Sequence, residues 1–222
     1  PDNTFDNDQV FFIGHQLQQL NFPNYSFQFP MNKGTYAFSY KAPRVGYQVP
    51  PVPNLMGFMR IRALDASSRR QGISFGIRTE VTTSKSDYYF DFTCSGLTTF
   101  VTMVPNLESS PYQINDGNWH RLVNRWEFVK SNPANNFGNL TTVCWIDGEL
   151  AYSGSQAVAR AYRAPITEEQ AGIIGGAGGG YPRYSAAGYY DEVLLASGLF
   201  LDPDDFLGTH YEYYKEPFED WI

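Results

Sequence analysis

NDGNWHRLV (residues 115–123) and VCWIDGELAYSG (143–154) are the two stretches that decide the fold. Each contains an Asp-Gly pair beside a run of aromatic and β-branched residues, Asp116-Gly117 in the first and Asp147-Gly148 in the second. An Asp-Gly pair favours tight turns because both residues tolerate the positive φ angles that such turns require. The two stretches therefore predict antiparallel strands that meet at tight turns.

Alternation of apolar and polar residues extends on both sides of these stretches. Such alternation is typical of strands that bury one face. The polar segment DASSRRQG (65–72) between two of the runs has the composition of a hairpin turn. So many short strands joined by short turns indicate antiparallel sheets. The runs are GFMRIRAL (57–64), GISFGIRTEV (72–81), DYYFDFTC (87–94), TTFVTMV (98–104), HRLVNRWEFV (120–129) and LTTVCWID (140–147).

The overall composition also favours an antiparallel β fold. Of the 222 residues, 17% are aromatic and only 18% are charged, and the chain has 20 glycines and 14 prolines. This mixture suits many short strands and tight turns. β-sandwiches of this length form one domain around one core. We therefore predict an all-β fold, an antiparallel two-sheet β-sandwich, as a single domain over residues 1–222.

The N-terminal part, residues 1–54, is expected to add short strands and then a proline-rich loop. The strands are predicted at VFFI (10–13), YSFQF (25–29) and TYAFSY (35–40). Four prolines follow between residues 42 and 54, and proline removes the hydrogen-bond donors that a sheet needs.

One or two short helices are predicted near the C-terminus. TEEQAG (167–172) begins with a threonine that suits an N-cap, followed by acidic residues in a first helical turn. DPDDFLGTHYEYY (202–214) begins with an aspartate cap and a proline at the first helical position. Residues 207–222 are predicted to be an acidic, aromatic tail.

The net charge of −7 lies mostly at the C-terminal end, because residues 202–222 hold seven acidic residues and one lysine. The rest of the chain is nearly neutral and lacks the clustered lysines and arginines that nucleic acid or anionic lipid would require. The chain has no apolar run of the length that a membrane-spanning helix needs. We expect no nucleic-acid partner and no membrane insertion. The chain begins at Pro1, so we expect a processed protein or a fragment of a larger one.

A third motif completes a pattern. GIIGG (172–176) precedes AAGYYDEVLLASGLFLDPDDF (186–206), and together with the two Asp-Gly stretches this ordered set covers about residues 55–206. It resembles the laminin-G-like, pentraxin-like group of the concanavalin A-like lectin and glucanase superfamily. The resemblance implies a jelly roll of two packed antiparallel sheets.

The resemblance also bears on the polar residues within the motifs. In this fold the residues at Trp119, His120 and Asp147 seal turns and pack the core, and Asp191 and Glu192 brace a strand end. We expect these structural roles here.

Catalysis is not expected. The retaining glucanases of the superfamily place carboxylates on one strand as E-x-D-x-x-E, and the chain has no such spacing. Retaining hydrolysis needs two carboxyl groups about 5 Å apart. The alginate lyases of the same fold have a Q-I-H strand, whereas here Gln113-Ile114 is followed by Asn115. A polysaccharide-degrading enzyme is therefore the least favoured function.

A loop rich in glycine and tyrosine is the predicted recognition rim. Exposed aromatic rings stack on the face of a sugar ring, and charged or amide groups bind its hydroxyls. The alternative is that this loop packs against a neighbouring subunit. The loop is GGAGGGYPRYSAAGYY (175–190), and its predicted carbohydrate- or partner-binding residues are Tyr181, Arg183, Tyr184 and Tyr189.

Metal binding and disulfide formation stay open at this stage. Laminin-G-like domains hold calcium at a sheet rim, so the resemblance admits calcium, and no other cofactor is expected. The conceivable rim ligands are Asp65, Asp87, Asn106 and Asp191, and no metal site is assigned. Cys94 and Cys144 each lie in a predicted strand, where they are either bridged or two buried thiols.

The favoured function is a non-catalytic carbohydrate-recognition or adhesion module on the surface of a cell or particle. The alternative is a structural subunit, such as a virion decoration, fibre or extracellular filament protein, whose partners are other subunits or further copies of itself. In that case aromatic residues of the tail would form a docking strip. These residues are Tyr211, Tyr213, Tyr214, Phe218 and Trp221.

Overall fold

The computed structural model describes residues 11–13, 20–21, 31–43, 55–79, 85–131, 137–158, 167–174 and 188–199. Within them the regular structure is twelve strands and one short 3-10 turn, η1 (Leu107–Ser109). No helix in this part of the chain is long and apolar enough to cross a membrane. The strands are β1 (Phe11–Ile13), β2 (Leu20–Asn21), β3 (Lys33–Lys41), β4 (Leu55–Leu64), β5 (Arg70–Thr79), β6 (Ser86–Cys94), β7 (Leu97–Val104), β8 (Trp119–Lys130), β9 (Gly138–Ile146), β10 (Glu149–Val158), β11 (Thr167–Ile174) and β12 (Gly188–Ser197).

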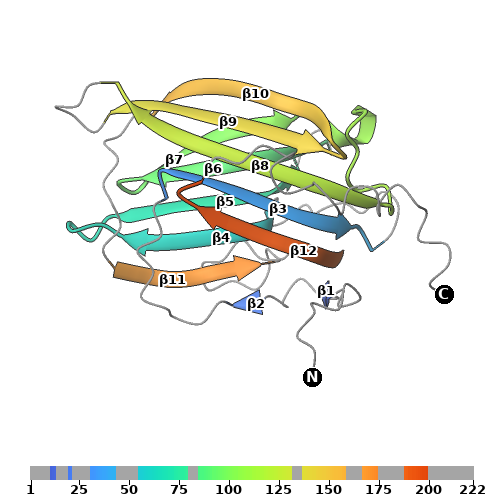
Figure 1. Cartoon of the computed structure of the whole chain (residues 1–222), viewed down its shortest axis with the longest axis horizontal. Coiled ribbons are helices and arrows are strands. Elements are labelled where there is room, and N and C mark those ends of the chain that lie inside the picture. The colour runs from blue at the N-terminus through green and yellow to red at the C-terminus, as the bar shows by residue number, and fades with distance from the viewer. Residues whose placement is uncertain are drawn as a thin grey trace.

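The strands form two six-stranded sheets that pack face to face (Figure 1). Sheet A has the order β1-β12-β3-β8-β9-β10, and sheet B has the order β2-β11-β4-β5-β6-β7. All neighbouring strands are antiparallel. At one side the sheets approach each other, where the side-chain amide of Gln156 on β10 donates to the carbonyl of Phe100 on β7. The predicted all-β, two-sheet sandwich is confirmed.

Asp147-Gly148 makes the tight turn that its sequence predicts, whereas Asp116-Gly117 lies in the loop between η1 and β8 and joins no two strands. Asp147 has φ 53° and Gly148 has φ 82°, the two positive values of a two-residue hairpin turn, and this turn joins β9 to β10. Gly117 has φ 90° just before β8 begins.

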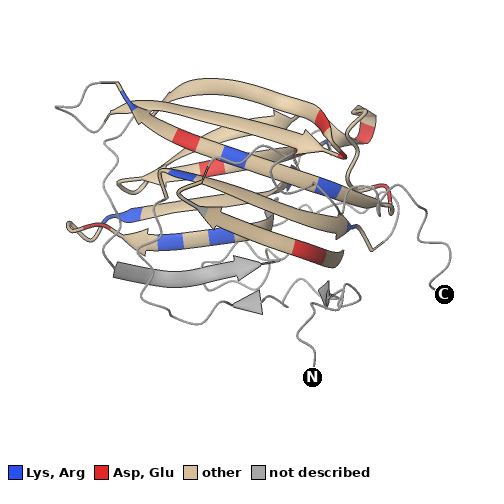
Figure 2. Cartoon of the chain, in the orientation of Figure 1, with Lys and Arg blue, Asp and Glu red and all other residues tan. Residues whose placement is uncertain are grey.

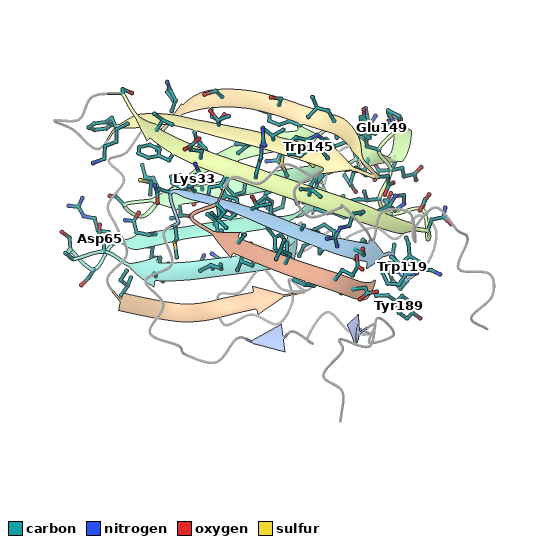
Figure 3. The ribbon with its side chains drawn as sticks, in the orientation of Figure 1. Lys33, Asp65, Trp119, Trp145, Glu149 and Tyr189 are labelled. Carbon is teal, nitrogen blue, oxygen red and sulfur yellow. The ribbon has the colours of Figure 1, made fainter. Side chains whose placement is uncertain are left out.

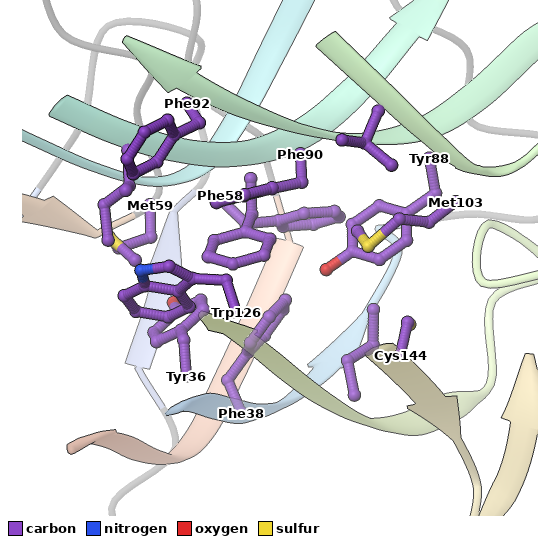
Figure 4. Packing of buried hydrophobic residues seen from close by; sticks show 14 of the residues in the cluster. Tyr36, Phe38, Phe58, Met59, Tyr88, Phe90, Phe92, Met103, Trp126 and Cys144 are labelled. Atoms are coloured by element: carbon purple, nitrogen blue, oxygen red, sulfur yellow. The ribbon is translucent and has the colours of Figure 1, made fainter. Parts of the chain in front are cut away.

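Aromatic side chains from both sheets fill the core (Figure 4). Trp126 of β8 is fully buried, its ring centroid lies 5.7 Å from that of Phe75 and 5.8 Å from that of Phe90, and its indole N–H donates to the carbonyl of Met31. Gly34 leaves room for this ring, because a Cβ at that position would lie 2.6 Å from it. Most of the stabilisation of the sandwich therefore comes from this apolar interior.

One hydrogen bond between buried polar side chains joins the two sheets across the core. Asn124 lies on the core side of β8, and its side-chain oxygen accepts a hydrogen bond of 2.9 Å from the hydroxyl of Tyr88 in the opposite sheet. Its side-chain amide donates to the carbonyl of Tyr36 at 3.4 Å. Because a buried amide is costly without partners, these bonds fix how the two sheets face each other.

The helix predicted at 167–172 is wrong, because β11 occupies this segment. It pairs with β4, with Thr167 opposite Leu64, and with β2, with Ile174 opposite Leu20. The cap and the helix-forming residues are local signals, and the backbone hydrogen bonds offered by two neighbouring strands override them. The second predicted helix, at 202–214, and the strand predicted at 25–29 lie outside the described residues.

Both cysteines are free and buried, so the bridged alternative is wrong. Cys94 belongs to β6 in sheet B, and Cys144 belongs to β9 in sheet A. Burial raises the pKa of the Cys94 thiol to about 12 and also raises the pKa of Cys144. Each thiol behaves as a small apolar side chain of the core.

Candidate functional site

The outer face of sheet B, which points away from the core, carries a row of small residues at its centre. Alternate residues of β5 point to opposite faces, so Ile73, Phe75 and Ile77 fill the core. The residues that alternate with them face outward, namely Gly72, Ser74 and Gly76. We call these three residues the β5 row.

Charged and aromatic residues flank the β5 row on both sides. Arg60 of β4 lies opposite Ser74, which in turn lies opposite Asp91 of β6, and Asp91 lies opposite Phe100 of β7. Arg62 lies one step along β4, opposite Gly72. Guanidinium groups thus stand on one side of the row, and a carboxyl group and an aromatic ring stand on the other.

Figure 2 shows Lys and Arg positions on β4. Two of them, Arg60 and Arg62, are half-buried, so their side chains are only partly open to solvent. The nearby Arg78, on β5, forms an ion pair of 3.5 Å with Asp87. Its charge is therefore balanced at one end of this face.

Asp91 is the carboxyl group nearest the β5 row. The hydroxyl of Ser74 donates a hydrogen bond to its Oδ2. Burial raises the pKa of Asp91 to about 6, and the Ser74 bond and the charge of Arg62 oppose this rise without cancelling it. The carboxyl group of Asp91 therefore keeps its proton to a higher pH than an exposed aspartate does.

Two aromatic rings extend this face toward β7. Tyr89 is buried, and burial raises its pKa well above the ordinary value, so that its hydroxyl keeps its proton. The centroid of the Phe100 ring lies 6.2 Å from that of Tyr89 with a tilt of 57°, and Phe100 is 50% exposed. Phe100 therefore offers an apolar ring to solvent beside a polar floor.

We call this set of residues the arginine face: Arg60, Arg62, Gly72, Ser74, Gly76, Tyr89, Asp91 and Phe100. The chemistry it offers is two positive charges, one titratable carboxyl group and one exposed ring, around a strip of backbone with almost no side chains. The strip itself is buried, and the side chain of Arg62 lies against Gly72, where an added Cβ would be 3.3 Å from the Arg62 Cγ.

The predicted recognition rim is only partly described. Tyr189 lies on β12 in sheet A, is 37% exposed, and packs its ring beside Trp119, with centroids 6.5 Å apart and a tilt of 58° (Figure 3). Tyr181, Arg183 and Tyr184 lie outside the described residues, as do the tail residues Tyr211, Tyr213, Tyr214, Phe218 and Trp221. Tyr189 therefore belongs to sheet A, whereas the arginine face belongs to sheet B.

His120 joins the two Asp-Gly turns, as expected from the resemblance. Its Nδ1 lies 2.8 Å from Oδ2 of Asp147, and its Nε2 lies 2.8 Å from Oδ1 of Asp116. Both carboxylates also accept backbone N–H groups, from Arg121 at Asp147 and from Asn118 at Asp116. His120 is therefore a structural link between turns that are distant in sequence.

This link predicts a pH-dependent contribution to stability. Burial lowers the pKa of His120, but its bonds to Asp147 and Asp116 outweigh burial and raise the pKa above 6.5. Burial likewise opposes the shift at Asp116, yet hydrogen bonds, first from His120, bring its pKa below 3.8. The histidine contribution is complete below about pH 6.5 and is lost as the pH rises through the folded-state pKa. The Asp116 contribution is present above about pH 3.8 and is lost as the pH falls through its folded-state pKa.

His120→Gln is therefore expected to cost about 1–2 kcal/mol in the free energy of unfolding near pH 5.5 and less near pH 8.5. Urea titrations of both proteins at the two pH values measure the difference. Asp147→Asn, which removes one of the two charges, should weaken the pH dependence as well. An equal cost of His120→Gln at both pH values would show that the ion pairs contribute nothing.

The residues considered as calcium ligands have protein partners. Asp65 accepts the backbone N–H groups of Ser67 and Arg69 and the side-chain amide of Gln71, so it shapes the β4–β5 turn. Asp87 Oδ1 accepts the N–H of Asn106. In the described ranges no three His, Cys, Asp or Glu residues gather as metal ligands do.

The last of those residues, Asp191, lies on β12 in sheet A and accepts the N–H of Glu192. Glu192 forms a 3.5 Å ion pair with Arg121 and offers its carbonyl to the same guanidinium group at 2.9 Å. Glu192 thus braces β12 against β8, as the resemblance implies.

Comparisons with known proteins find similarity in structure alone. No protein-family model matches the chain, and no curated protein matches it in sequence. The CBM40 module of the Ruminococcus gnavus IT-sialidase, bound to α2,3-sialyllactose, aligns with a TM-score of 0.51 and 9% identity, over 90% of this chain and 95% of that chain. A leech intramolecular trans-sialidase aligns with a TM-score of 0.53 and 12% identity, over 90% of this chain and 26% of that chain. An alginate lyase from Klebsiella pneumoniae aligns with a TM-score of 0.43 and 13% identity, over 75% of this chain and 60% of that chain.

At such identities the likeness is one of fold. The chain shares the two-sheet β-sandwich fold of these proteins. The concanavalin A-like and laminin-G-like assignments stay predictions.

Proposed function

We propose that this chain is a non-catalytic carbohydrate-recognition module that binds an oligosaccharide on the arginine face. The observation that carries the proposal is the β5 row, a strip of small residues with two arginines of β4 on one side and an acid and aromatic rings of β6 and β7 on the other. We also propose that the module works on the outside of a cell or particle, where such ligands are displayed.

The groups on this face suit a sugar. A guanidinium group and a carboxyl group can each make paired hydrogen bonds to neighbouring hydroxyls. The exposed ring of Phe100 can pack against the apolar C–H face of a pyranose. The buried floor of Ser74 and Tyr89 holds these groups in fixed positions, so that little entropy is lost on binding.

The size of the face favours an oligosaccharide over a single sugar. Neighbouring strands lie about 4.8 Å apart, so three spacings separate β4 from β7 by about 14 Å. A ligand that contacts both Arg60 and Phe100 must span that distance, which exceeds one sugar ring. One end would lie among the arginines and the other against the aromatic ring.

The spacing of the carboxyl groups on β6 supports binding without hydrolysis. Asp87 and Asp91 are four residues apart on one strand, which corresponds to about 13 Å. Glycoside hydrolysis requires two carboxyl groups about 5–9.5 Å apart. Asp87 is in addition held by Arg78 and by the N–H of Asn106.

The fold gives independent support. The CBM40 module of comparable extent binds α2,3-sialyllactose, which establishes that a sandwich of this shape can serve as a sugar-binding module. The proposed location on the arginine face of this chain rests on its own residues.

Phe100→Ala is expected to weaken oligosaccharide binding about tenfold, since a packed ring contributes about 1 kcal/mol or more. Wild type and variant are compared on an oligosaccharide array and then by calorimetry on the best ligand. Leu97→Ala is the matched control, because Leu97 is 48% exposed and begins the same strand, beside the turn from β6, outside the arginine face. A blank array for the wild type, or release of sugar products from it, would refute the proposal.

A further inference from the structure

We propose that residues 200–222 pack along the outer face of sheet A of their own chain and add a third layer to the sandwich. These residues lie outside the described part of the chain. Three observations carry the inference: the centre of that face is buried, the described chain ends on it, and the residues that follow have a matching chemistry.

The outer face of sheet A carries small residues at its centre. On β3, Tyr36 and Phe38 fill the core, so the residues that alternate with them face outward. One of these, Ala37, lies opposite Val123 of β8, which faces outward as well. We call the set of small outward residues the sheet A patch: Thr35, Ala37, Ser39, Val123 and Val143.

The sheet A patch is buried although it faces away from the core. Ala37, Val123 and Val143 are each at most 5% exposed, and none of them belongs to the hydrophobic cluster between the sheets. The side chain of Arg121, which borders the patch, is only 11% exposed. A two-layer sandwich leaves its outer faces to solvent, and side chains this short shield one another incompletely. The burial therefore indicates a further layer over the patch, as some domains have.

The described chain ends on this patch. β12 pairs with β3, and just after β12 the backbone N–H of Gly198 donates to the carbonyl of Lys33. The hydroxyl of Thr35, a member of the patch, donates to the carbonyl of Leu199 at 3.0 Å. Residue 200 therefore follows directly beside the patch, which makes residues 200–222 the segment best placed to cover it.

The segment is long enough to cross the whole face. Residues 200–222 can span up to about 75 Å, at about 3.3 Å for each extended residue. β8, the longest strand of sheet A, has 12 residues and measures about 40 Å. The segment can therefore follow the length of the patch and still have residues left to turn back.

The composition of the segment matches the face. Residues 202–222 hold seven acidic residues and one lysine, with aromatic residues among them. On β8 the patch residue Val123 lies between Arg121 and Arg125, and Lys and Arg positions on this strand are visible in Figure 2. Arg121 pairs with Glu192, and Arg125 lies over a tryptophan ring. A guanidinium group has five N–H donors, so each arginine can bind a carboxylate of the segment and keep these partners. The aromatic rings of the segment would then cover the apolar centre.

Carbodiimide cross-linking of the full chain tests the contact. The reagent joins a carboxyl group directly to a neighbouring amine, and mass spectrometry identifies the linked peptides. We expect links from acidic residues of 202–220 to Lys33 or Lys41, the two lysines of β3. Lys85, beside β6 in sheet B, should not be linked to that segment. The ion pair of Lys33 with Glu127, at 3.1 Å, serves as the positive control.

Isotope labelling identifies which chain supplies the segment. The cross-linking is repeated on an equal mixture of unlabelled and fully nitrogen-15-labelled chains. Links within one chain join two peptides with the same label, whereas links between two copies also give mixed pairs. We expect the links from 202–220 to β3 to contain no mixed pairs.

Val123→Glu tests whether the sheet A patch holds the segment. A carboxylate at the centre of the patch would be buried beneath an acidic segment, which is unfavourable, so the segment should leave the face. We expect chymotrypsin to cut within residues 200–222 at least about tenfold faster than in wild type. Thr102→Glu adds the same charge at an exposed position of sheet B and should keep the wild-type rate. Circular dichroism and urea titration confirm that both variants fold.

The outcomes are independent of oligosaccharide binding, so they bear on this inference alone. Links within one chain and faster cleavage in Val123→Glu support it. Mixed-label pairs would assign the segment to a second copy and refute it. Absence of links to Lys33 and Lys41, while the Lys33–Glu127 control is linked, refutes it even if Val123→Glu does not fold. Equal cleavage rates in wild type and a folded Val123→Glu also refute it.

Discussion

Trp126→Ala is expected to lower the free energy of unfolding by about 3–5 kcal/mol, the range for removing a large aromatic side chain from a core. The indole ring is fully buried against Phe75 and Phe90, which stack on each other, and its N–H donates to the carbonyl of Met31. Its removal opens a cavity between the sheets and leaves that carbonyl without its donor. Urea unfolding followed by circular dichroism measures the loss.

Trp145→Ala provides the matched control. Trp145 is only half-buried on the outer face of sheet A, where the Arg125 guanidinium lies 4.7 Å from the centroid of its ring. We expect a cost of about 1 kcal/mol there, mainly from the lost cation–π contact. Trp126→Phe should fall between the two, and it keeps the test usable if Trp126→Ala does not fold. Equal costs at both tryptophans would contradict the assignment of Trp126 to the centre of the core.

Arg62→Gln is expected to weaken the binding of an oligosaccharide on the arginine face about tenfold or more. A hydrogen bond to a charged group contributes about 1.5–3 kcal/mol, and glutamine retains one donor but loses the charge and the paired geometry. Arg62→Lys keeps the charge and should recover only part of the affinity, because an ammonium group lacks the planar fork of donors of a guanidinium group. Calorimetry on the best ligand of the oligosaccharide array measures both effects.

Arg69→Gln is the control for charge. Arg69 is exposed in the turn between β4 and β5. Its replacement by glutamine therefore changes the net charge of the chain by the same amount as Arg62→Gln and leaves the arginine face intact. We expect its affinity to match that of wild type. If both variants weakened binding equally, the attraction would come from the overall charge and not from a site around Arg62.

The strands and turns of the sandwich are predictable from local signals. Most strands show a period-two alternation, as in β6, where Tyr88, Phe90 and Phe92 are buried. The turn between β9 and β10 follows from Asp147-Gly148, which suits the positive φ angles found there. These signals depend on neighbours in the sequence, so no knowledge of the sheet is needed.

β11 and β2 escaped prediction for different reasons. β11 begins with Thr-Glu-Glu-Gln, which locally resembles a helix start, and becomes a strand because β4 and β2 flank it. β2 (Leu20–Asn21) is two residues long, which is too short for an alternation of apolar and polar residues to show.

The arginine face could not be predicted because it depends on register. The sequence shows Arg60 and Arg62 in one run and Gly72, Ser74 and Gly76 in the next, which by themselves indicate two amphipathic strands. Only the pairing of Arg60 with Ser74, and of Ser74 with Asp91, brings them to one place. The spacing Gly-x-Ser-x-Gly was the available signal, because a strand that is apolar on one face and carries only small residues on the other lets another group approach its backbone closely.

Chemical labelling of the two buried cysteines can report how often the sandwich opens. Alkylating reagents attack the thiolate, and both thiols are withdrawn from solvent with raised pKa values. Cys94 belongs to one sheet and Cys144 to the other, so their modification requires the layers to part. The rate of labelling at each cysteine therefore reports how often that half of the interior becomes accessible, and unequal rates would reveal which sheet loosens first.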